Sequence, residues 1–119
     1  MADLKEYITN NQEFGSVHIS QDVIASISAH AAAEVEGVYA LGNPETSERF
    51  GKKSNVKGIR LSMENDALAI ECSVIAQYGY RVVELAQTVQ ENVRNAVESM
   101  TGLKVSAVDV NVCGIMMKK

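Results

Sequence analysis

The chain has 119 residues, of which 46% are hydrophobic and 22% are charged, and its formal net charge at pH 7 is −4. This length allows one domain with a single core, and the composition is typical of a globular protein rather than a disordered or fibrous one. The acidic balance argues against nucleic-acid binding, because neutralising phosphates requires a basic surface. We therefore expect no nucleic-acid partner.

The sequence has no pattern that indicates secretion or a membrane span. Its start lacks the basic segment and apolar run of a signal peptide, and no window of about 18 apolar residues could cross a bilayer. The two cysteines, Cys72 and Cys113, lie far apart and form neither a CxxC pair nor a disulfide-rich pattern. We expect a cytoplasmic protein with reduced thiols and no direct membrane insertion.

The first third of the chain predicts one strand, one helix and a short second strand. Residues 1–13 are polar and aperiodic and are expected to form a flexible leader. Residues 16–19 alternate polar and apolar side chains, which predicts a half-buried strand with its apolar side chains on the core. Ser20 is a good N-cap for a helix that is expected to end at Gly37. The apolar run 38–41 then predicts an edge strand.

Residues 42–57 show no periodicity and become basic in their second half. Long loops in compact domains are often functional. The run Gly51-Lys52-Lys53-Ser54 lacks the upstream glycine that a phosphate-binding loop needs at its fixed spacing. Two interpretations stay open, a solvated basic loop and a contact for an anionic ligand or a partner. The candidate contact residues are Arg49, Lys52, Lys53 and Lys57.

The second half predicts a hairpin, a long helix and a last strand. Apolar side chains alternate over 59–63 and again over 68–74, with turn residues at 64–66 between them. Residues 81–100 place apolar side chains at the i, i+3, i+4, i+7 positions of one helical face. The apolar alternation of 108–112 predicts the last strand.

The start of that last strand is out of phase with its end. Leu103 and Val105 fall on the opposite alternation from Val108, Val110 and Val112. Because a strand places successive side chains on opposite faces, an extra residue is needed to bring both groups into one core. We predict a bulge or loop near 106–107.

These elements predict an α+β fold, a two-layer sandwich in which two main helices pack on one face of a mixed four- to five-stranded sheet. The domain is expected to span 14–115, with a frayed C-terminus at 116–119. Such an arrangement leaves the other face of the sheet open. Its predicted outward side chains include His18, Arg60, Glu71, Asp109, Asn111 and Cys113.

The open face carries groups that could ligate a metal, but without the spacing that supports a site. His18, Glu71, Asp109 and Cys113 come from three predicted strands and form no HxxxH or CxxC pattern. The sequence also has no nucleophile elbow, zinc-protease or dinucleotide-binding motif. We therefore expect no enzyme activity, cofactor or metal, and interpret this face as solvated or partner-binding.

Several segments, taken together and in order, resemble the alkaline shock protein, or envelope stress response, family of Gram-positive bacteria. The resemblance covers about 14–115 and implies a small cytoplasmic protein without known catalytic residues. It also implies a role in cell-envelope homeostasis, with some members held at the membrane by an anchoring partner or self-associating. The segments include Gly15-Ser-Val-His-Ile-Ser20, Glu34-Val-Glu-Gly37-Val38, Gln77-Tyr78-Gly79, Val97-Glu98-Ser-Met-Thr-Gly102-Leu103 and Val108-Asp109-Val110-Asn111-Val112.

Two function hypotheses from different classes follow. The first is a non-enzymatic stress-response protein that acts through a protein partner, which could be membrane-anchored, or through homo-oligomers. The second is a regulatory module that binds a lipid or central metabolic enzyme, or an anionic ligand, through the basic loop 49–57. An RNA-binding module is disfavoured by the acidic charge and by the absence of aromatic and basic strand motifs.

Overall fold

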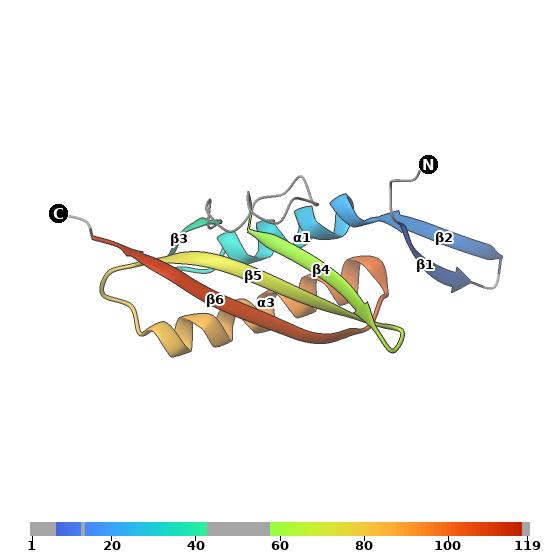
Figure 1. The fold of residues 1–119 in the computed structure, drawn as a ribbon. Coiled ribbons are helices and arrows are strands. Elements are labelled where there is room, and N and C mark those ends of the chain that lie inside the picture. The colour runs from blue at the N-terminus through green and yellow to red at the C-terminus, as the bar shows by residue number, and fades with distance from the viewer. Residues whose placement is uncertain (1–6, 13, 43–57, 118–119) are drawn as a thin grey trace.

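The computed structural model describes residues 7–12, 14–42 and 58–117. Its two helices lie on one face of a four-stranded sheet, and a two-stranded hairpin extends from one end (Figure 1). The predicted α+β fold class is confirmed. In chain order the elements are β1 (Tyr7–Gln12), β2 (Gly15–Ser20), α1 (Gln21–Ala33), β3 (Val38–Leu41), β4 (Ile59–Glu64), β5 (Ala67–Gln77), α3 (Val82–Thr101) and β6 (Val105–Met116).

Strand β5 is the centre of the main sheet, because the other three strands all pair with it. Strands β3 and β4 are antiparallel to β5, and β6 is parallel to it. The Ser73 N–H donates to Gly58 O at 2.8 Å, and Ser73 O accepts from the Gly42 N–H at 2.9 Å. Both bonds leave the same residue on the same side, so β3 and β4 share one edge of β5. Strand β6 takes the other edge.

The two strands on that shared edge meet end to end at a pair of glycines. The chain leaves the edge at Gly42 and returns to it at Gly58. A Cβ built on Gly58 would lie 2.6 Å from Gly42 N, and Gly58 has φ +84°. Glycine is required there for two reasons, since any other residue would collide with the backbone and would also adopt a strained conformation.

The turns and bulges of the sheet match the chemistry of their residues. Strands β4 and β5 are joined by Asn65 and Asp66 alone, with φ 52° and 66°. Positive φ at both positions is the type I′ turn, which fits the twist of a hairpin and which Asn and Asp tolerate. In the β5–β6 ladder Leu68 pairs with Val105 and Ala69 with Ala107, so Ser106 is an extra residue. The predicted hairpin and bulge are both confirmed.

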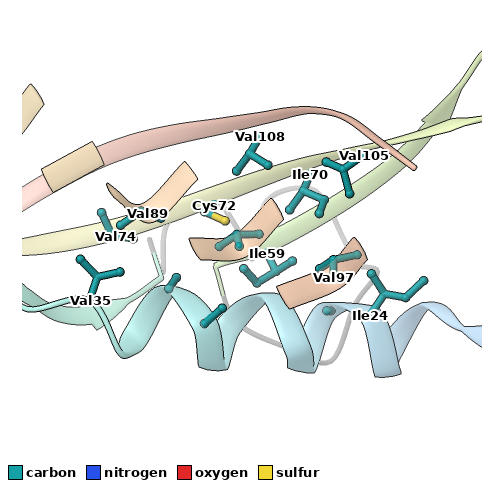
Figure 2. Packing of buried hydrophobic residues seen from close by; sticks show 14 of the residues in the cluster. Ile24, Val35, Ile59, Ile70, Cys72, Val74, Val89, Val97, Val105 and Val108 are labelled. Carbon is teal, nitrogen blue, oxygen red and sulfur yellow. The ribbon is translucent and has the colours of Figure 1, made fainter. Parts of the chain in front are cut away.

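Helix α3 contributes to the core through a buried stripe of Leu85, Val89, Val93 and Val97, which faces the inner side of the sheet. Figure 2 shows side chains from α1, α3 and the strands meeting in one apolar layer. Burying each of these large side chains contributes roughly 1.5–3 kcal/mol. The helix ends at Thr101, one residue beyond the predicted span 81–100, and its C-cap Gly102 adopts a left-handed conformation with φ 76°.

Helix α1 is shorter than its sequence pattern predicts. It ends at Ala33 with Glu34 as the C-cap, rather than at Gly37. The chain needs the following residues to turn back toward the sheet, and Gly37 serves that turn with φ +103°. Val35 falls within the predicted helix but lies in this connection, where it is 7% exposed and packs in the core.

The N-terminal segment corrects two predictions. Residues 7–12 of the expected leader form β1, and the strand predicted over 16–19 pairs with β1 rather than with the main sheet. Ile8 pairs with Ile19, and both pack against the core, whereas Val17 is 46% exposed. Alternation reveals a strand but not its partner, and the polar residues of β1 pair through their backbone, which leaves no side-chain pattern.

The glycine junction generates a stability prediction. Gly58→Ala is expected to lower the free energy of unfolding by at least about 2 kcal/mol, because a backbone clash adds to the cost of positive φ. The matched control is Gly79→Ala, with φ +106° and no atom within 4 Å of the added Cβ. It should lose only about 1–2 kcal/mol. Urea denaturation measures the free energy of unfolding of both variants. Equal decreases would show that the close approach to Gly42 does not add to the destabilisation.

Candidate interaction surfaces

The face of the sheet opposite the helices carries a polar row across three adjacent strands. We call its outward side chains the open face. Arg60 on β4 and Asp109 on β6 flank Glu71 of β5 in register. Arg60 Nε lies 3.7 Å from Glu71 Oε1, and Asn111 Nδ2 donates to Glu71 Oε2 at 2.8 Å. Sequence reasoning predicted these four residues for the open face, and the structure brings them together there.

The polar row is a surface network rather than a buried reactive centre. The side chains of Arg60 and Glu71 are 52% and 39% exposed, and an ion pair exposed to this extent contributes about 0–1 kcal/mol. Within the described residues no group of three or more His, Cys, Asp or Glu side chains is placed to hold a metal ion. The row can instead offer fixed hydrogen-bond donors and acceptors to a partner.

The remaining predicted site residues lie elsewhere. His18 is on β2, where its Nδ1 lies 3.1 Å from Thr9 Oγ1, so it is not part of the open face as predicted. The reason is the separate β1–β2 hairpin, which removes this strand from the main sheet. The four basic residues Arg49, Lys52, Lys53 and Lys57 lie outside the described residues, and their role stays a prediction.

One end of the molecule gathers exposed apolar side chains from four separate segments, and we call it the apolar end. These segments meet because the Gln77 N–H donates to Gly37 O at 2.8 Å and the Tyr78 N–H donates to Met116 O at 3.0 Å. Figure 1 shows β3, the loop after β5, the start of α3 and the C-terminal end of β6 together there. Its exposed residues are Tyr39, Tyr78, Tyr80, Val82, Val83, Ile115, Met116 and Met117.

The two tyrosines that flank Gly79 differ in their surroundings. Tyr80 packs on the backbone at Gly37, since a Cβ built there would lie 2.8 Å from Tyr80 Cδ2. Its hydroxyl donates to Glu36 Oε2 at 3.3 Å, and the charge of Glu36 raises the pKa of Tyr80. Tyr78 is 67% exposed. The side chain of Tyr80 is therefore partly covered by the chain, at 39% exposed, whereas that of Tyr78 is largely open to solvent.

The apolar end gives no periodic signal in the sequence, because its residues lie where the periodicity of the strands and helices stops. Tyr78 sits in a loop, and Met116 and Met117 come where the last strand ends. The signal that could have found them is the concentration of tyrosine and methionine at element ends, since both types are enriched in protein interfaces.

A shallow groove lies between the two helices, with a volume of about 570 Å³. Asn92 Nδ2 donates to Ala31 O at 2.7 Å and joins the helices at its floor. His30 lies on its rim with a side chain 77% exposed, and its Nε2 is 3.0 Å from Glu34 Oε2. The groove is lined by Ser26, Ile27, His30, Ala31, Glu34, Asn92, Asn95, Ala96, Ser99 and Met100.

The fold and these surfaces define a small two-layer α+β domain whose helices cover one face of its sheet. The chain belongs to the alkaline shock protein 23 family, described as having a cell envelope-related function, with residues 9–117 matched. This is not a known family of enzymes. In the part of the chain that the structure describes, neither helix is long and apolar enough to span a membrane.

Similar proteins come from Gram-positive bacteria. The uncharacterized protein YqhY of Bacillus subtilis is 35% identical over 104 residues, which cover 85% of this chain and 77% of the relative. The uncharacterized protein Spy1535 of Streptococcus pyogenes is 35% identical over 106 residues, covering 88% and 82%. Among solved structures, a variant of MamM CTD aligns with a TM-score of 0.49 at 14% identity, covering 83% of this chain and 99% of that one.

The two cysteines should differ sharply in reactivity. Burial, with a smaller contribution from the charge of Glu71, raises the pKa of Cys72 to about 12, whereas Cys113 is exposed. A thiol with a raised pKa stays protonated at neutral pH and is a poor nucleophile. Ellman's reagent at pH 8 is therefore expected to label one thiol per native chain, and two in denaturant. Cys113→Ser should abolish the native reaction, and labelling that persists in this variant would contradict the burial of Cys72.

Proposed function

We propose that this protein acts in cell-envelope homeostasis by binding other proteins rather than by catalysis, and that the apolar end is the principal contact. The family description supports the envelope role. The observation that carries the binding proposal is the exposure of large apolar side chains that converge at one end, with Tyr78 at 67%, Val83 at 68% and Met117 at 65%. Apolar side chains gathered in this way on a protein surface mark interaction sites.

The chemistry of the apolar end fits a protein partner. Tyrosine and methionine bury a large area and adapt to an opposing surface. The open face adjoins this end through β5 and β6, and its network of Arg60, Glu71 and Asn111 offers polar contacts of the kind that surround an interface core. A partner that is itself bound to the membrane would hold this cytoplasmic protein at the envelope.

Helix α3 supplies a matched pair of variants for the test. Val83 in its first turn and Met100 in its last turn are 68% and 70% exposed, but only Val83 belongs to the apolar end. Replacing either with glutamine keeps a good helix former at the position. We expect Tyr78→Ser combined with Val83→Gln to reproduce the deletion phenotype of the host strain under a cell-wall antibiotic, while Met100→Gln behaves as wild type.

Immunoblots must show equal protein levels, and thermal unfolding must show that the variants fold. Loss of the proteins that crosslink to the wild type should accompany the phenotype in the Tyr78 and Val83 variant. Normal growth and unchanged crosslinking in this variant would count against the apolar end as the principal contact.

A further inference from the structure

Strand β6 has an edge that pairs with no other strand among the described residues. It pairs with β5 alone, although it is the longest strand at 12 residues. Figure 1 shows it along the margin of the sheet. The outward backbone groups of an edge strand are a template for pairing with another chain.

Strand geometry identifies which residues point toward that free edge. Ser73 directs its backbone N–H and C=O toward β3 and β4. Because these groups point to opposite edges at successive residues of a strand, the even-numbered residues of β5 direct theirs toward β6. The Leu68 N–H accordingly donates to Lys104 O. In the parallel ladder, Asp109 and Asn111 then turn their backbone groups toward β5. The intervening residues Val108, Val110 and Val112 turn theirs toward the free edge.

One contact supports this assignment. Gln90 Nε2, on α3, donates to Val108 O at 2.9 Å, so this carbonyl is not used within the β5–β6 ladder. A carbonyl oxygen has two lone pairs and can accept a second bond. The edge is therefore capped at one carbonyl and open at the residues that follow.

The open part of the edge has few of the features that prevent pairing. It contains no proline or lysine, and Asp109 is its only charged residue. Bulges at Ser106 and at Cys113, the residues skipped in the ladder, bracket a regular segment over 107–112. Bulges protect an edge locally, so the segment between them is where another strand fits.

We propose that two copies of this chain pair through β6, antiparallel, about a two-fold axis at Val110. The register follows from the side chains of the open face. With Val110 opposite its own copy, Asp109 faces Asn111 of the second copy, and this acceptor–donor pair occurs twice. A shift that places Val108 opposite Val110 would bring the two copies of Asp109 together, and like charges directly opposite are destabilising.

The opposite shift is also less favourable. It places Asn111 opposite itself and sets Asp109 against the bulge at Cys113. The Val110 register thus gives the best match of the three. Because the axis is perpendicular to the sheet, the helices of both copies lie on the same side, and the two open faces form one continuous surface. The apolar ends take no part, so this proposal is independent of the proposed function.

Sedimentation velocity over a range of concentrations tests the pairing, using the wild type, two variants of β6 and Val83→Gln. The wild type is expected to show a concentration-dependent dimer. Asn111→Asp sets carboxylates opposite each other twice, and should raise the dissociation constant roughly tenfold. Adding Asp109→Asn to that variant restores an acid–amide pair across the interface and should return the constant to within about threefold of wild type.

The double variant keeps the Asn111→Asp substitution beside Glu71 but removes the charge of Asp109, which also flanks Glu71. Thermal unfolding must therefore show that the two variants are equally stable as single chains. A wild type that stays monomeric at about 1 mM, or a dimer indifferent to Asn111→Asp, would overturn the proposal. Failure of Asp109→Asn to restore the dimer would also overturn the proposal, because that result indicates a register in which Asn111 lies opposite Asn111 of the second copy. A dimer lost instead on Val83→Gln would place the contact at the apolar end and would also overturn it.

Discussion

The burial of one face of β5 beneath two helices is the interaction on which the rest of the structure depends. Every other strand of the main sheet pairs with β5, and its inward side chains Leu68, Ile70, Cys72 and Val74 are all at most 1% exposed. Helix α3 connects β5 to the parallel strand β6, and α1 packs beside α3 on the same face. The helices and the sheet bury their apolar side chains in this single layer of contacts. The opposite face of the sheet therefore needs no further element packed on it.

The surfaces available for association are consequences of this one-sided arrangement. In the part of the chain that the structure describes, no helix packs on the open face, and β6 pairs with β5 alone, which leaves its other edge free. The apolar end collects the connections between the strands and helices. These surfaces differ in chemistry: the first is a polar network, the second a row of backbone groups and the third a group of tyrosine, valine and methionine side chains. The described residues of this small scaffold therefore present three surfaces of different chemistry.

Much of the fold was predictable from the sequence because its strongest patterns are local. The apolar stripe from Leu85 to Val97 predicts a helix, and Asn65-Asp66 predicts a tight turn, from a few neighbouring residues in each case. The change in apolar alternation around Ser106 correctly predicted a bulge. The pairing of β2 with β1 was not predictable, because alternation carries no information on which strand lies alongside. For the same reason His18 was assigned to the wrong surface, whereas Arg60, Glu71, Asp109 and Asn111 were correctly grouped.

Amide hydrogen exchange along β6, measured by NMR in dilute protein, tests the central claim most directly. If β6 ends the sheet, the amides of Asp109 and Asn111, which face β5, exchange slowly, while those of Val110 and Val112 exchange close to the rate of unprotected amides. Protection should thus alternate residue by residue. Uniformly slow exchange across these four amides in dilute protein would mean that both sides of β6 are covered within a single chain, and would contradict the account of a sheet open at this edge.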